Sequence, residues 1–138
     1  MTGISLYQCI PSYKPLPTVR LIKSLVDSNC KILLDIEDSI QDVQHPDLTA
    51  DLKANARRDF AAIIKNLPDQ KFSLRINSIR SNEFLHDKEL LHKFADNIES
   101  VFIPKVESSN DLTIFCNEFG DKHKLNLIVE TQRGLDNI

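Results

Sequence analysis

The sequence predicts an α/β fold in which a parallel sheet is covered by helices. Two observations indicate this. Short apolar runs alternate along the 138 residues with longer segments whose apolar residues recur every three or four positions. The short runs are also apolar at most positions rather than at alternate ones, which is typical of parallel strands buried on both faces.

Each expected strand is a short apolar run bounded by proline or by polar residues. The first ends at Pro11, since proline cannot donate a hydrogen bond to a neighbouring strand. In chain order the runs are ISLYQCI (4–10), KILLDI (31–36), FSLRIN (72–77), SVFIP (100–104) and NLIVET (126–131).

The segments between the runs have helical periodicity. The second is the clearest, with the apolar stripe Leu52, Ala56, Phe60, Ile63, Ile64 and Leu67. Of the other helices, one is expected to begin after Pro17, one to span about 83–95, and one to run from a cap at Ser108 or Ser109 to Gly120. The last is expected to begin a few residues before Ile138. The charges of the second helix are interpreted as a solvated face: Asp51, Lys53, Arg57, Arg58, Asp59 and Lys65.

The units recur at intervals close to the ~31 residues per unit of a (β/α)₈ barrel of about 250 residues. We therefore expect residues 1–138 to form a single domain, the N-terminal part of a TIM barrel with about its first five βα units. An open doubly wound sheet is the competing architecture. With only three glycines the chain has no glycine-rich phosphate loop, which argues against a nucleotide-binding version of that sheet.

Composition excludes several classes of function. The chain is 41% hydrophobic and 27% charged with a net charge of −3, so neither nucleic acid nor an anionic membrane is an expected partner. No apolar stretch approaches the ~20 residues of a membrane span. Three widely separated cysteines, Cys9, Cys30 and Cys116, suit reduced core thiols in a cytoplasmic protein. The four histidines are expected at the surface.

Charged and polar residues follow four of the five runs. An apolar run that ends in charge places that charge where water or a partner can reach it. The carboxyl ends of parallel strands share one rim, which is where such folds carry their active sites. In chain order these residues are Asp35, Glu37 and Asp38; Arg75 and Asn77; Lys105 and Glu107; and Glu130 and Thr131.

The segments LLDIEDSIQD, SLRINS, FIPKVESSNDL and LIVETQRGL, in this order and spacing, resemble the citrate lyase beta-subunit-like family of the HpcH/HpaI aldolase group. The resemblance extends from the first expected strand to the last residue. It implies a trimeric or hexameric (β/α)₈ barrel that binds Mg²⁺ at its C-terminal rim. The implied reaction is cleavage of a carbon–carbon bond in a 3-hydroxy acid, or in its CoA or carrier-protein thioester, which yields a 2-oxo acid.

The resemblance also implies roles for single residues. Glu130 matches the glutamate that binds Mg²⁺, and Arg75 matches the arginine that binds the substrate and stabilises the enolate. Glu37 is expected to orient Arg75 or a reacting water, and Lys105 to contact the substrate. The aspartate that would be the second metal ligand lies after a sixth strand, which these 138 residues do not include.

Other interpretations stay open. Arg75 could neutralise Glu37 and Asp35 in a structural pair, Lys105 could pair with Glu107, and Glu130 could be a solvated rim residue. The alternatives for the whole chain are a non-catalytic half-barrel, a subunit that depends on a partner, or a flavodoxin-like binding domain. The arginine usual before the first strand of that family is absent and Ser12 stands where glycine is common, which argues against a CoA-thioester substrate.

Overall fold

A computed structural model describes residues 5–11, 14–25, 28 and 30–137. Over these residues strands and helices alternate as the periodicity predicts. The elements are β1 (Leu6–Pro11), α1 (Pro15–Leu25), β2 (Cys30–Asp35), a 3₁₀ turn (Pro46–Leu48), α2 (Thr49–Asn66), β3 (Phe72–Arg75), α3 (Phe84–Lys93), β4 (Ile98–Ile103), α4 (Ser109–Phe119), β5 (Lys124–Leu127) and α5 (Gln132–Asp136). Among them, no helix combines the length and apolar character needed to cross a membrane.

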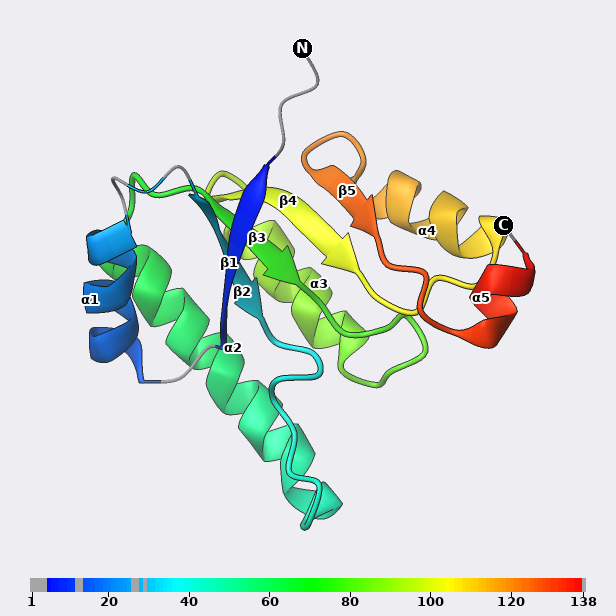
Figure 1. Cartoon of the computed structure of the whole chain (residues 1–138), viewed down its shortest axis with the longest axis horizontal. Helices are drawn as coiled ribbons and strands as arrows, with labels where there is room; N and C mark the ends of the chain where they lie inside the picture. Colours follow the sequence, from blue (N-terminus) through cyan, green and yellow to red (C-terminus); the bar gives the residue numbers. More distant parts are fainter. Residues whose placement is uncertain (1–4, 12–13, 26–27, 29, 138) are drawn as a thin grey trace.

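The five strands form one parallel sheet in the order β1-β2-β3-β4-β5 (Figure 1). Sequential order with crossovers of the usual right hand places the helices on one face of the sheet. In agreement, α1 packs against α2 and α2 against α3. The order differs from the 2-1-3-4-5 order of flavodoxin-like sheets, so the doubly wound alternative does not describe this sheet.

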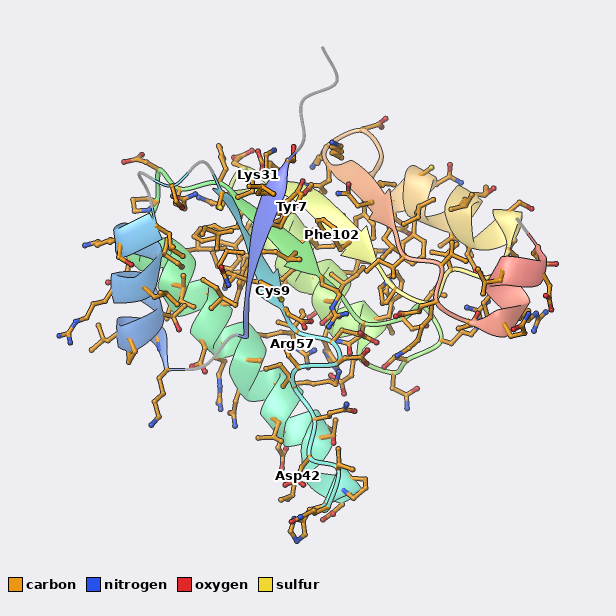
Figure 2. The ribbon with its side chains drawn as sticks, in the orientation of Figure 1. Tyr7, Cys9, Lys31, Asp42, Arg57 and Phe102 are labelled. Carbon is orange, nitrogen blue, oxygen red and sulfur yellow. The ribbon has the colours of Figure 1, made fainter. Side chains whose placement is uncertain are left out.

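The sheet is curved. The rings of Tyr7 on β1 and Phe102 on β4 meet edge to face with their centroids 5.0 Å apart (Figure 2). Three strand spacings separate β1 from β4, which is about 14 Å in a flat sheet. Contact between these rings therefore indicates that the face away from the helices is concave.

The hydrophobic core lies between the sheet and the helices. Phe60 on α2 is fully buried and meets Phe72 of β3 and Phe94, just after α3, edge to face. The stripe predicted for α2 is largely confirmed, because its central members are buried and Leu67 packs against the core, but Leu52 is 38% exposed.

Two predictions about burial are wrong. Cys9 and Cys116 are exposed rather than in the core, and Cys116 lies on the solvent side of α4 because its neighbour Phe115 faces inward. His123 is buried rather than exposed. Its Nδ1 lies 2.8 Å from the carbonyl oxygen of Ile98, so the backbone of β4 satisfies the imidazole.

Candidate functional site

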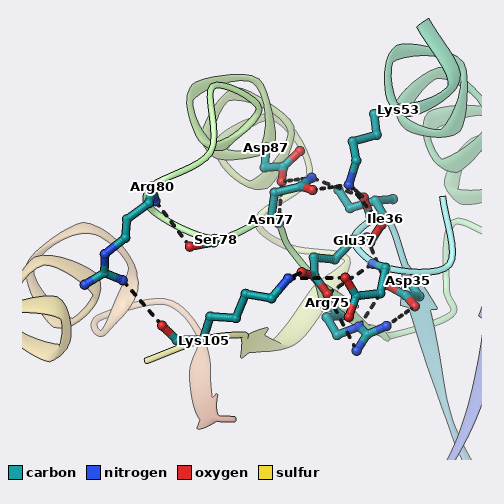
Figure 3. A network of polar contacts seen from close by, with 11 residues as sticks. Asp35, Ile36, Glu37, Lys53, Arg75, Asn77, Ser78, Arg80, Asp87 and Lys105 are labelled. Atoms are coloured by element: carbon teal, nitrogen blue, oxygen red, sulfur yellow. Dashed lines mark hydrogen bonds and ion pairs between the residues drawn. The ribbon is translucent and has the colours of Figure 1, made fainter. Parts of the chain in front are cut away.

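Asp35, Glu37, Asp38, Arg75 and Lys105 gather at the carboxyl ends of β2, β3 and β4, and we call these five residues the rim cluster. Figure 3 shows Asp35, Glu37, Arg75 and Lys105. The parallel register places Asp35, the last residue of β2, directly beside Arg75, the last residue of β3. Arg75 donates from Nε to Asp35 Oδ1 at 2.9 Å and from Nη2 to Oδ2 at 2.5 Å. This two-point contact fixes the plane of the guanidinium.

The Asp35–Arg75 pair is charged and largely buried. Asp35 is 1% exposed, and burial by itself would raise its pKa, but hydrogen bonds from Arg75 and from the backbone amide of Glu37 lower the pKa below its usual value. The hydrogen bond to Asp35 raises the pKa of Arg75. The Arg75 side chain is 21% exposed, so it is not fully closed off from a ligand.

Glu37 links the two rim cations. Its Oε1 accepts from Lys105 Nζ at 2.5 Å, and its Oε2 lies 3.7 Å from Arg75 Nη1. Lys105 also reaches Asp38 Oδ1 at 3.3 Å. The hydrogen bond to Glu37 raises the pKa of Lys105, so this amine stays an ammonium ion at neutral pH. Glu37 is buried, whereas the Lys105 side chain is 40% exposed.

Arg80 fixes the backbone that carries Lys105. Lys105 has the left-handed conformation, with φ of 54°, which costs energy for a residue other than glycine. Arg80 donates to the Lys105 carbonyl oxygen at 3.4 Å and to both carboxylate oxygens of Asp111, at 3.1 and 3.0 Å. Glu107 lies 3.4 Å from Arg80, so the pair Lys105–Glu107 considered from the sequence is replaced by Lys105–Glu37 and Arg80–Glu107.

A second set of polar residues lies beneath the rim cluster and comes from α2, α3 and the end of β3. Lys53, Arg57, Asn77 and Asp87 form this set, which we call the buried support. Asn77 donates from Nδ2 to Asp87 at 2.7 Å, and Arg57 donates to the other Asp87 oxygen at 2.9 Å. Burial raises the pKa of Asp87, against the hydrogen bonds donated by Asn77 and Arg57.

The interpretation of the α2 charges as a solvated face is therefore wrong for Lys53 and Arg57. Lys53 is 9% exposed, and the Arg57 side chain is 11% exposed. The sequence held a signal, because Lys53 precedes Ala56 by three positions and Phe60 by seven and so lies on the apolar stripe. Arg80 and Asp111 carry no such signal, since their pairing joins the loop before α3 to the first turn of α4, which is distant in sequence.

Glu130, the predicted metal ligand, lies apart from these contacts. β5 ends at Leu127 rather than at 131, and Glu130 is an exposed residue of the segment that leads to the Thr131 cap of α5. Within the described ranges, no three His, Cys, Asp or Glu side chains are grouped to hold a metal ion. If Glu130 binds Mg²⁺, an octahedral shell needs further oxygens from substrate, water or protein.

Comparison with known proteins shows a likeness in fold. No protein-family model and no curated protein matches the sequence. Among solved structures, the crystal structure of RipC from Yersinia pestis is similar, with a TM-score of 0.63 and 19% sequence identity. The alignment covers 96% of this chain and 49% of the RipC chain, so this chain spans about half the length of that protein.

Proposed function

We propose that this chain is part of a (β/α)₈ barrel enzyme, a Mg²⁺-dependent lyase that cleaves a 3-hydroxy acid or its thioester to a 2-oxo acid. The observation that carries the proposal is the pair of partly open cations, Arg75 and Lys105, held by buried carboxylates at the carboxyl ends of adjacent parallel strands. The curved sheet in sequential order supports the barrel. The resemblance of the four motifs supports a trimer or hexamer.

The rim cluster suits a reaction in which negative charge develops on a carbonyl oxygen. Arg75 would donate to that oxygen from the open part of its guanidinium, and Lys105 would bind the substrate carboxylate. Asp35 and Glu37 hold both cations in place before the substrate arrives, so little reorganisation is needed as the enolate forms. Lys105 acts as a charge, because its raised pKa opposes the neutral amine that a Schiff base requires.

Glu130 would bind Mg²⁺ together with substrate and water oxygens. When bound, the metal supplies Lewis-acid stabilisation of the oxygen on which charge develops. A second protein ligand would come from another segment of a longer chain or from a partner subunit, since the described residues do not group three ligands.

The lack of a group of three metal ligands among the described residues favours a second candidate function, a non-catalytic half-barrel or a subunit that depends on a partner. The two candidates differ in Mg²⁺ affinity. One carboxylate binds the ion weakly, whereas a completed site binds it in the range that isothermal titration calorimetry measures.

A cleavage assay tests the proposal. The purified protein is incubated with Mg²⁺ and a panel of 3-hydroxy acids and their CoA thioesters, and 2-oxo acid products are trapped with a hydrazine reagent. We expect a 2-oxo acid to form with at least one member and to disappear when EDTA is added. Absence of product across the panel, from protein whose circular dichroism shows it folded, would reject the lyase in favour of the second candidate.

A further inference from the structure

We propose that Lys53 is a positioning residue that holds Glu37, and through Glu37 the two rim cations, in their working arrangement. The inference rests on the proposed function for its catalytic meaning, but its structural content can be tested without any turnover.

Lys53 is a buried ammonium whose hydrogen bonds all go to neutral oxygens. It extends from α2 and donates to the carbonyl oxygens of Ile36 at 3.4 Å and Glu37 at 2.9 Å, and to Oδ1 of Asn77 (Figure 3). Burial lowers the pKa of Lys53. An ammonium in such a place is costly unless its donors are used, and here all three are.

The acceptor on Asn77 is itself oriented. The Asn77 Nδ2 group donates to Ile36 at 3.1 Å and to Asp87 at 2.7 Å, and the backbone amide of Asn77 donates to the same Asp87 oxygen at 2.7 Å. These contacts turn Oδ1 toward Lys53. The ammonium therefore joins the segments that follow β2 and β3, which carry the rim cluster.

One residue separates Lys53 from the rim cations. The carbonyl of Glu37 is held by Lys53, while the carboxylate of Glu37 contacts Lys105 at 2.5 Å and lies 3.7 Å from Arg75. When Lys53 is removed, the Glu37 carbonyl keeps the backbone amide of Ile40 as a donor, at 3.2 Å, but loses the ammonium that ties it to α2 and Asn77, and the carboxylate loses its fixed position. A role confined to stability would leave the contact between Glu37 and Lys105 unchanged in the folded protein.

The reactivity of Lys105 is the readout that separates the two roles. We expect Lys53→Met to raise the acetylation rate of Lys105 by N-hydroxysuccinimidyl acetate at pH 8 at least threefold, measured on its peptide by mass spectrometry. The reason is that loss of Glu37 lowers the pKa of Lys105 and frees its amine. Removing a neighbouring cation would by itself raise the Lys105 pKa and slow acetylation, so the expected sign belongs to the positioning role.

Two variants bracket the experiment. Glu37→Gln should raise Lys105 acetylation at least as much as Lys53→Met, while Lys65→Met, an exposed lysine of the same helix, should leave the rate unchanged. In the cleavage assay Lys53→Met should lower kcat more than it raises KM, and Lys65→Met should do neither. If the wild-type protein cleaves nothing, the proposed function fails, and the Lys105 rates still test the positioning role.

A wild-type Lys105 rate in folded Lys53→Met would overturn the proposal. Thermal unfolding establishes that the variant is folded. If Lys53→Met does not fold, Lys53→Gln replaces it, since the shorter amide keeps a polar end but cannot reach all three acceptors. If neither variant folds, Lys53 contributes to stability and the positioning role is rejected.

Discussion

Replacing Arg75 by methionine is expected to lower the free energy of unfolding by about 3 to 5 kcal/mol at pH 7, because it leaves a buried carboxylate without its partner. Asp35 is 1% exposed and would keep neutral donors such as the backbone amide of Glu37 but no guanidinium. Where lyase activity is present, turnover should also fall about a hundredfold or more, as on removal of a donor to a developing oxyanion.

The pH dependence of this loss has a definite sign. The folded-state pKa of Asp35 is lowered, so the pair stabilises the protein above the pKa of an unfolded aspartate, near 3.9, and this contribution disappears as pH falls through the lower folded-state value. The difference between wild type and Arg75→Met should therefore narrow from pH 7 to pH 3, as measured by urea denaturation.

Arg20→Met, a change of an exposed arginine on α1, is the matched control and should alter stability by no more than about 0.5 kcal/mol. A loss below about 1 kcal/mol for Arg75→Met at pH 7 would mean that the pair does not hold the rim in place.

Replacing Phe60 by alanine is expected to lower the free energy of unfolding by about 3 to 5 kcal/mol, the range for truncating a buried aromatic residue. Phe60 is fully buried, and its ring meets both Phe72 and Phe94 edge to face, so the change leaves a cavity between α2, β3 and the end of α3. Chemical denaturation measures the loss, with Leu85→Ala, 66% exposed on α3, as a control expected near zero. A loss for Phe60→Ala no greater than that for Leu85→Ala would contradict the packing of α2 on the sheet.

The order of elements could be predicted from the sequence because local periodicity determines it. Phe60 and Ile63 repeat at helical spacing, and KILLDI and FSLRIN are short segments rich in apolar residues. The contact between Asp35 and Arg75 could also be predicted, since residues at the ends of neighbouring parallel strands lie on one rim. The barrel expected from the sequence implies a curved sheet, but the contact between the Tyr7 and Phe102 rings that reveals the curvature has no local sequence signal.

The support beneath the rim could be predicted only in part. A charged residue on a helix usually faces solvent, but Lys53 is buried, and its position on the apolar stripe was the better guide. Arg80, in the loop before α3, meets Asp111, in the first turn of α4, 31 residues later in the sequence, and no local pattern predicts this contact. Glu130 was placed at a strand end, but β5 is shorter than its apolar run because the residues after Leu127 turn toward α5.

The central claim is that the rim cluster, with Mg²⁺, stabilises an enolate. Its most direct test is the exchange of the methyl protons of acetate and acetyl-CoA for deuterium in D₂O, followed by proton NMR, because the enolate forms on the acyl fragment and not on the 2-oxo acid. The account predicts that wild-type protein with Mg²⁺ accelerates the exchange over buffer with Mg²⁺ and that Arg75→Met loses at least about a hundredfold of that acceleration. Exchange by folded wild-type protein no faster than buffer, or equal exchange by both proteins, would contradict it.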